Sequence, residues 1–365
     1  KRYSSDQSQT AIRKNLELYL RTVSSKDVSF IKNFTLKTEM GYCHALSYLW
    51  LYYKWLENQP ERTDKYGSNW FNKTVKTVTE WDGKQQLSRE TIADFERFLS
   101  LIDHLQSYEA QINLEKAFSL SSLGVNEKSL KQKYTIASTF TLETLSDLLK
   151  NIVYEDELIL VSYKELDTRP HTVGLFKIGD NYYYYDPNAP SGEIQTTQIH
   201  EIADIILSHG ISSTVSFAVM SFDETPFPYP NQKDFLTQTN PSIDDDILIA
   251  SVKVRCLDCL SFFLEKGTNP NQVNDKGATA LMLASYNGHS ETIDMLIEKG
   301  ADPNKADNTG STALMYASEN GQSETINKLI EKDADPNQAN KTGSTALMCA
   351  SENGHSETIN NLIEK

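Results

Sequence analysis

The stretch Gly41-Tyr42-Cys43-His44-Ala45-Leu46-Ser47-Tyr48-Leu49-Trp50 predicts a buried helix that begins close to a cysteine. Its apolar residues recur on one helix face, at Ala45, Leu46, Leu49, Trp50 and Tyr53. Cys43 would lie in the first turn, where free backbone N–H groups and the helix dipole favour a thiolate over a thiol. On this stretch alone a packed, inert Cys43 is the simpler interpretation, because cysteine is among the residues most often buried.

The composition is that of a globular chain long enough for two domains. The 365 residues are 39% hydrophobic and carry a net charge of −15, which argues against a nucleic-acid-binding surface. No apolar run approaches the roughly 20 residues of a membrane span. Four cysteines are too few for a disulfide framework in a chain of this size, so we expect a reducing compartment. The chain begins with Lys1 rather than Met, which indicates a trimmed N-terminus.

Helix patterns come first along the chain and strand patterns follow, which predicts an α+β domain. Helical spacing covers residues 1–36, the helix from Cys43 to before Pro60, 88–108 and 138–153, whereas 61–86 are polar and irregular. The strand candidates are residues 157–163, 171–178, 182–185 and 215–222.

A proline-rich stretch then predicts a linker between two domains. Pro226, Pro228, Pro230 and Pro241 fall within it. We therefore expect an α+β domain over 1–225, a linker over 226–244 and a repeat domain over 245–365.

The last third of the chain repeats itself. The sequence Gly277-Ala-Thr-Ala-Leu-Met282 returns with small changes at Gly310 and at Gly343, both times after 33 residues. A degenerate copy precedes these and begins near Asp245. This period and the Leu-Ile-Glu-Lys-Gly-Ala-Asp-Pro-Asn segment resemble the ankyrin repeat. The resemblance implies an all-α solenoid of four units that binds protein.

The repeats depart from the usual pattern at the opening motif, at one helix end and at the last unit. Ala280 and Met282 replace the usual Pro and His of the opening motif, which predicts lower stability per repeat. Asp333 stands where Gly267 and Gly300 end their helices, and a left-handed non-glycine residue there should cost about 1 kcal/mol. The last repeat stops at Lys365 without a polar cap, so either its second helix is the cap or the chain is cut there.

A cysteine nucleophile needs a base, and the best-placed histidine is His171, which begins a strand after Pro170. A two-residue turn after Ile178 would give paired residues a sum of 359 or 361 and put Asp186 on the same strand face as His171. With the smaller sum the two are diagonal neighbours with Cβ atoms roughly 7–8 Å apart. Taken singly, Asp186 is an ordinary turn residue and His171 a strand-end histidine.

These motifs resemble the papain-like cysteine proteases of the YopT and AvrPphB effector type. The resemblance covers about residues 30–222 and rests on Gly-x-Cys-x-x-Leu, the strand-opening His and Asp-Pro-Asn fifteen residues later. It implies Cys43 as nucleophile, His171 as general base and Asp186 as the orienting carboxylate. Residues 36–40 contain no Gln or Asn for an oxyanion hole, and Asn33 is a distant candidate. The implied reaction is acyl transfer, by proteolysis, deamidation or transamidation.

The remaining cysteines have weaker patterns. Cys256 and Cys259 form a C-x-x-C without a second pair for zinc, so we expect them to pack in a repeat helix. Cys349 occupies the position of Leu283 and Tyr316, and this variation predicts a partner-facing site. The same reasoning applies to Tyr286, Glu319 and Glu352, which share one repeat position.

The two resemblances together imply a secreted bacterial effector that acts in the host cytoplasm or nucleus as a thiol hydrolase. The repeats would recruit a host protein, and their 18 acidic and 10 basic residues, a net of −8, predict a basic patch on it. We expect a monomer without cofactor, metal, nucleic acid or membrane span. The rival hypothesis is a catalytically dead domain on an ankyrin scaffold that binds and perturbs a host protein.

Overall fold

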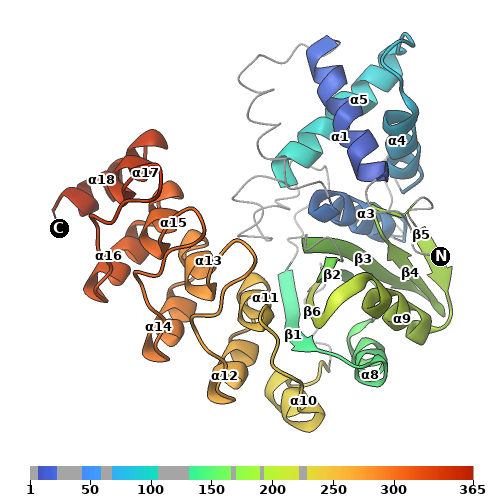
Figure 1. Cartoon of the computed structure of the whole chain (residues 1–365). Helices are drawn as coiled ribbons and strands as arrows, with labels where there is room; N and C mark the ends of the chain where they lie inside the picture. Colours follow the sequence, from blue (N-terminus) through green and yellow to red (C-terminus); the bar gives the residue numbers. More distant parts are fainter. Residues whose placement is uncertain are drawn as a thin grey trace. The chain divides into compact units, whose positions relative to one another are not determined.

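The computed structural model describes residues 7–22, 43–58, 68–105, 131–165, 170–189, 193–221 and 228–364 (Figure 1). Contacts between Cα atoms divide the chain into two compact units. The first contains most of the chain up to Tyr229. The second contains Pro230–Lys365 together with two short segments, Thr135–Phe140 and Ser212–Ser216.

The first unit opens with helices that share an aromatic core. Tyr19, Trp81 and Phe95 pack edge to face at its centre, with ring centroids 5.1 to 6.1 Å apart. The helices are α1 (Gln7–Thr22), α3 (Cys43–Glu57), α4 (Ser68–Glu80) and α5 (Arg89–Leu105).

Helix α4 lies in the stretch that the sequence patterns predict as irregular, and that prediction is wrong. Trp70, Phe71 and Val78 are buried on one face of α4, and the Trp70 indole N–H donates to Asp94 Oδ1 at 2.7 Å. The buried Asn15 amide donates to the carbonyl oxygens of Val78 and Thr79, which satisfies acceptors at the end of α4. Tertiary contacts thus stabilise this helix, whose polar Asn, Lys and Thr residues prevented its prediction from the sequence.

A six-stranded sheet follows, with the strand order β1-β6-β2-β3-β4-β5. Antiparallel ladders join β2 to β3, β3 to β4 and β4 to β5. The mixture of helices and sheet is the predicted α+β composition; the papain-like arrangement stays a prediction. The strands are β1 (Lys131–Thr139), β2 (Leu158–Glu165), β3 (Pro170–Ile178), β4 (Asn181–Tyr185), β5 (Glu193–Thr196) and β6 (Gly210–Ser221).

Helix α3 packs on one face of this sheet. A Cβ added at Gly174 would lie 2.9 Å from Trp50 Cε3 and 3.1 Å from Leu51 Cγ, so glycine allows the close approach of helix and strand. The buried Lys54 amine pairs with Glu193 Oε1 at 3.0 Å, which fastens β5 to the same helix. Helices α8 (Leu142–Ile152) and α9 (Ile199–His209) lie on the other side of the sheet (Figure 1).

Several elements of the sheet and of the helices that follow its strands differ from the sequence-based expectation. Residues 138 and 139 end strand β1, and helix α8 begins only at Leu142, after Thr141 and Thr144 form a reciprocal capping box. Strand β5 and helix α9 were not predicted. Strand β6 begins five residues before the predicted Val215, directly after His209.

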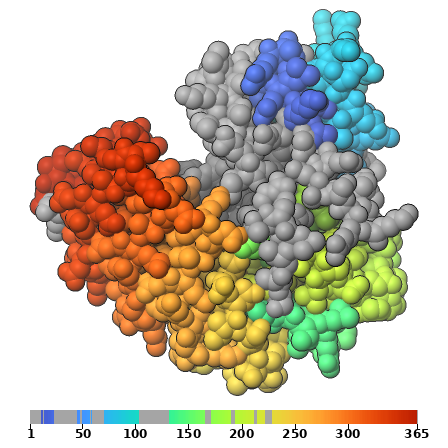
Figure 2. Space-filling model, in the orientation of Figure 1, coloured from blue at the N-terminus to red at the C-terminus, as the bar shows by residue number. Residues whose placement is uncertain are grey.

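The second unit contains four helix pairs at the predicted period. The first helices begin at Ile247, Ala280, Ala313 and Ala346, each 33 residues after the last. In Figure 2 the array runs in chain order from yellow to red. The pairs are α11 (Ile247–Lys253) with α12 (Leu257–Glu265), α13 (Ala280–Tyr286) with α14 (Ser290–Glu298), α15 (Ala313–Glu319) with α16 (Ser323–Glu331), and α17 (Ala346–Glu352) with α18 (Ser356–Ile363).

A further helix, α10 (Gln232–Thr239), forms inside the segment expected as a linker. Asn231 caps its start, and Asn240 ends it in the left-handed conformation. Gln232 Nε2 donates to the carbonyl oxygen of Thr135 at 3.2 Å, and Ser242 bonds to Thr139. These bonds satisfy polar groups of β1, the edge strand of the sheet.

The predicted backbone conformation at Asp333 is confirmed. Its φ is 65°, beside 95° and 92° at the equivalent glycines Gly267 and Gly300. Arg255 is a second exception, with a φ of 54° where Gly288 and Gly321 have 65° and 66°. The first repeat therefore has a non-glycine residue in a turn that its sister repeats form with glycine.

Candidate functional site

The β3–β4 hairpin brings His171 and Asp186 together as the smaller pairing sum predicts. The turn has two residues, with Gly179 at a φ of 56°, and Gly174 pairs with Tyr185. His171 Nε2 and Asp186 Oδ1 are 2.9 Å apart. The expected hydrogen bond between a strand-opening histidine and the first residue after the next strand is therefore present.

Asp186 is held in place by more than the histidine. Its Oδ1 also accepts the backbone N–H of Asn188 at 2.8 Å, and the residue is 5% exposed. Burial alone would raise the pKa of this carboxyl, but the hydrogen bond and charge of His171 outweigh burial, so the pKa lies below its usual value. Asp186 is thus a carboxylate at neutral pH, oriented toward His171.

The bond to Asp186 defines the state of the imidazole ring. A carboxylate is only an acceptor, so His171 donates the proton on Nε2 and, in the neutral ring, Nδ1 carries the lone pair. The side-chain amide of Asn188 lies 3.3 Å from Nδ1 and donates to it in this tautomer. The nitrogen that would act as the base is therefore occupied by a long hydrogen bond.

Aromatic and histidine side chains surround the pair. The Tyr163 ring packs edge to face on His171 with centroids 5.5 Å apart, and the hydroxyls of Tyr163 and Tyr184 are 3.3 Å apart. His209, at the end of α9, contributes to lowering the pKa of Asp186. The sequence analysis missed Asn188, although the Asp-Pro-Asn motif contains it. It also missed Tyr163, which the β2–β3 register pairs with His171, and His209, which lies at the end of α9.

Cys43 is the first residue of α3, but its side chain lies outside the described part of the structure. The oxyanion candidate Asn33 also lies outside the described residues. Helix α3 packs on the face that Gly174 presents, and since side chains alternate along a strand, the His171 ring points to the opposite face.

One contact nevertheless brings the N-terminal part of α3 to the edge of the sheet beside His171. Ser47, one turn after Cys43, donates to the carbonyl oxygen of Thr172 at 2.9 Å. Carbonyl groups lie in the plane of the sheet, and β4 pairs with β3 only as far as Gly174. The start of α3 therefore lies beside the backbone of β3, one residue from His171.

The repeat positions predicted to face a partner lie in the middle and at the last residue of the first helix of each pair. Tyr286 and Tyr316 contact edge to face at 6.2 Å, and the Tyr316 hydroxyl donates to Asp307 Oδ2 at 2.8 Å. Burial and the charge of Glu352 raise the pKa of the Glu319 carboxyl. Burial and both carboxylates raise the pKa of the Cys349 thiol, so this cysteine is a poor nucleophile. These two repeat positions therefore present mainly aromatic and acidic side chains.

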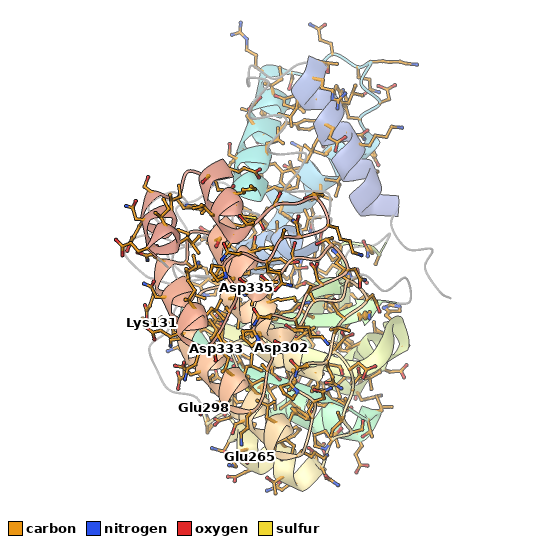
Figure 3. All side chains as sticks on the ribbon, turned by 60° about the vertical axis from the view of Figure 1, so that its left-hand side comes forward. Lys131, Glu265, Glu298, Asp302, Asp333 and Asp335 are labelled. Carbon is orange, nitrogen blue, oxygen red and sulfur yellow. A yellow bond between two sulfur atoms is a disulfide. The ribbon has the colours of Figure 1, made fainter. Side chains whose placement is uncertain are left out.

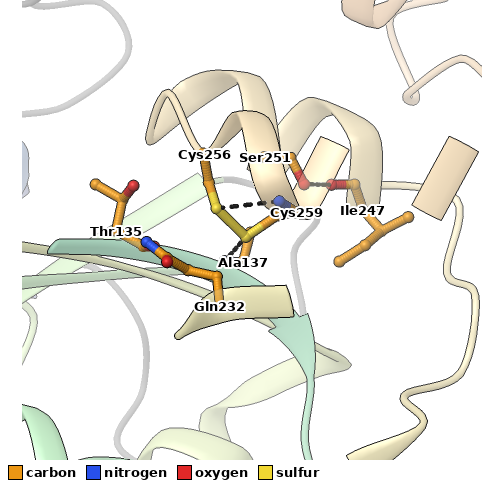
Figure 4. Close-up of a disulfide and its surroundings, with 7 residues drawn as sticks. All are labelled: Thr135, Ala137, Gln232, Ile247, Ser251, Cys256 and Cys259. Atoms are coloured by element: carbon orange, nitrogen blue, oxygen red, sulfur yellow. Dashed lines mark hydrogen bonds between the residues drawn. A yellow bond between two sulfur atoms is a disulfide. The ribbon is translucent and has the colours of Figure 1, made fainter. Parts of the chain in front are cut away.

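Cys256 and Cys259 are buried in a repeat helix as predicted, but they also form a disulfide, which the sequence analysis did not expect (Figure 4). The C-x-x-C spacing at the start of a helix could have predicted this disulfide. Within the described ranges, no three His, Cys, Asp or Glu side chains are grouped as metal ligands.

Comparison with known proteins identifies only the repeat region. Residues 247–340 and 305–365 match the family model for ankyrin repeats, in 3 copies. The C-terminal helix pairs are ankyrin repeats. No curated protein matches the chain. Ankyrin repeats bind proteins, so a protein partner follows from this match. None of the helices that the structure describes could span a membrane.

Proposed function

We propose that this chain recruits a host protein through its ankyrin repeats and attacks it with a Cys43–His171–Asp186 thiol hydrolase site. The observation that carries the proposal is the buried His171–Asp186 bond of 2.9 Å. It sits on a hairpin whose first strand accepts a hydrogen bond from Ser47, one turn into the helix that begins with Cys43. The proposed setting is that of an effector secreted by a bacterium into a host cell.

The tautomer supports a specific division of roles. Asp186 holds the Nε2 proton, so His171 Nδ1 is the atom that would deprotonate the Cys43 thiol. The thiolate attacks a carbonyl carbon, His171 then protonates the leaving amine, and water releases the acyl group from the sulfur. Asp186 stabilises the imidazolium that forms between these steps, because it stays ionised.

This mechanism requires one rearrangement at the base. Asn188 Nδ2 now donates to Nδ1, and it must give way before a thiol can donate its proton there. The existing bond is 3.3 Å long, near the limit for a hydrogen bond, so its loss costs little. The hydrogen bond that the Asn188 backbone N–H donates to Asp186 Oδ1 would keep the carboxylate in position meanwhile.

The charge of the repeats supports a basic partner. Glu265, Glu298, Asp302, Asp333 and Asp335 are exposed and follow one another along the array (Figure 3). Two of these pairs, Glu265 with Glu298 and Asp302 with Asp335, are repeat-equivalent positions. Such a row of carboxylates steers a basic surface and sets its register along the solenoid.

The decisive experiment labels the native chain with a thiol-directed inhibitor of papain-type enzymes and maps the modified residue by mass spectrometry. We expect fast labelling at Cys43 near neutral pH and a loss of at least tenfold in rate in His171→Ala. Asp186→Asn should slow labelling less, because the base remains. Cys349→Ser is the matched control and should leave the rate unchanged. Slow labelling of Cys43 that ignores His171 would exclude a thiolate–imidazole pair.

A specific observation favours a second candidate, a scaffold without catalysis. His171 is 2% exposed, its ring points away from the face that α3 covers, and both ring nitrogens are hydrogen-bonded. In that case His171→Ala would lower stability without changing Cys43 reactivity, and Asn188→Ala would not increase labelling. Under the enzyme hypothesis Asn188→Ala removes the amide that bonds to Nδ1 and should increase labelling.

A further inference from the structure

The first ankyrin unit differs from its three sisters in one turn. In the three other units a left-handed glycine precedes the second helix, and a His or Gln comes directly after this glycine. A buried Thr follows three residues after that His or Gln. In the first unit the equivalent residues are Arg255, Cys256 and Cys259. The glycine has been replaced by a cationic residue at a φ of 54°, and both other positions carry sulfur.

The two sulfurs are not equivalent (Figure 4). Cys256 is the N-cap residue of α12, and its Sγ accepts the backbone N–H of Cys259 at 3.2 Å. Cys259 Sγ accepts the backbone N–H of Ala137 at 3.4 Å. Cys256 is 3% exposed, whereas Cys259 is completely buried. Each sulfur therefore has a backbone donor that would stabilise a thiolate, and Cys256 is the one nearer to solvent.

Local charge adds to this asymmetry. Arg255 is exposed and adjacent to Cys256, and a neighbouring cation favours a thiolate. Burial and the charge of Arg255 lower the pKa of the neighbouring His289 to about 4, so that ring is neutral and adds no charge. Asp258 is exposed on the first turn of α12 and opposes the effect of Arg255 in part.

We propose that Cys256–Cys259 is a redox-active disulfide that undergoes thiol–disulfide exchange with a dithiol reductant. A thiolate of the reductant attacks Cys256 Sγ, the Cys256–Cys259 bond breaks, and Cys259 leaves as a thiolate that keeps the Ala137 N–H. The second thiol of the reductant then attacks its own sulfur in the mixed disulfide and releases Cys256 as a thiolate at the N-terminus of α12. Two electrons pass to the protein, the two thiol protons end on Cys256 and Cys259, and the reductant becomes a disulfide.

The test uses the native full-length chain and counts free thiols by alkylation and mass spectrometry. Of the four cysteines, two should be blocked before and available after treatment with dithiothreitol, without denaturant. After reduction, Cys256 should alkylate at least tenfold faster than Cys259. The proposal would be overturned if all four thiols were free in buffers of every ratio of reduced to oxidised glutathione. It would also be overturned if the disulfide were reduced only when the chain is unfolded. The experiment is independent of Cys43, so it can fail while the proposed hydrolase stands.

Variants at Arg255 separate a redox role from a structural one. Arg255→Gly introduces the residue that the other repeats have at this position. It removes the strain of a non-glycine residue at positive φ, so stability should be kept or raised. It also removes the positive charge, so thiol–disulfide exchange should slow several-fold. Arg255→Lys keeps the charge and should exchange at close to the original rate. Equal rates in the wild type and in Arg255→Gly would exclude the assigned role of Arg255 at this site.

Discussion

The α+β unit and the ankyrin array are stabilised by contacts over very different distances along the chain. In the first unit, Ser47 bonds to Thr172 and Trp50 to Glu193, 125 and 143 residues apart. In the array, Asn271 bonds to Gly300 and Asn304 to Asp333, each 29 residues apart. A local defect in the array should therefore stay near its own repeat, whereas a defect between α3 and the sheet should weaken the whole first unit.

The largest loss of stability is expected at the contact between Gly174 and α3. Gly174→Val places a branched side chain against Trp50 and Leu51, and we expect a loss of about 3 kcal/mol from the first unit. Calorimetry should show the transition of that unit moving down while the transition of the repeats stays. Gly174→Ala is the graded control and should cost less. A shift of both transitions together would contradict the independence of the units.

Glu157 should make the stability of the first unit depend on pH. It is fully buried, accepts the Tyr229 hydroxyl, and its Oε2 has no hydrogen-bond partner among the described residues. Burial raises its pKa to about 7, against the lowering effects of Tyr229 and Lys133. The protonated form is therefore favoured in the fold, so this contribution is complete below about pH 4.5 and is lost as pH rises through about 7.

Glu157→Gln keeps the acceptor for Tyr229 and removes the titration. We expect its melting temperature to exceed that of the wild type by about 5 °C at pH 8 and by little at pH 5. Glu155→Gln, two residues away, is the control for charge alone. An equal difference at both pH values would show that Glu157 is not the titrating group.

The same contrast explains how much could be predicted from the sequence. The repeats were predictable because each unit restates its pattern after 33 residues, and even the left-handed Asp333 followed from comparison with Gly300. The His171–Asp186 bond was predictable because one hairpin and its turn fix the register. Helix α4 and strand β5 were missed because Asn15, Asp94 and α3 stabilise them from distant parts of the chain. The face that α3 covers was equally beyond prediction, since only Gly174 meeting Trp50 reveals it.

Within the array, the threonine caps allow a finer test of locality. Thr279 accepts the N–H of Met282 at 3.2 Å, Thr312 accepts that of Met315 at 3.5 Å, and Thr345 makes no side-chain cap bond. Replacement by Ala should therefore cost about 1 kcal/mol at 279, less at 312 and least at 345. Hydrogen exchange, read repeat by repeat, measures each loss. An equal cost at all three positions would mean that the hydroxyl acts in the unfolded chain or through packing instead.

The left-handed position at the end of the second helix of a repeat isolates the free-energy cost of backbone strain, which is the smallest change expected. Asp333 and Gly300 occupy equivalent left-handed positions, with φ of 65° and 92°, and a Cβ at Gly300 would meet no atom within 4 Å. Only the backbone conformation then opposes a side chain, at a cost of about 1 kcal/mol. The larger entropy of glycine in the unfolded chain offsets part of this cost, so Gly300→Asp should destabilise its repeat and Asp333→Gly stabilise its own, each by about 0.5 kcal/mol. The bond from Asn304 to the Asp333 carbonyl is to the backbone and survives the change. If the two substitutions do not have opposite signs in denaturant unfolding of the array, the strain at Asp333 is relieved by a contact of its carboxylate, and the repeats are less alike than their sequences indicate.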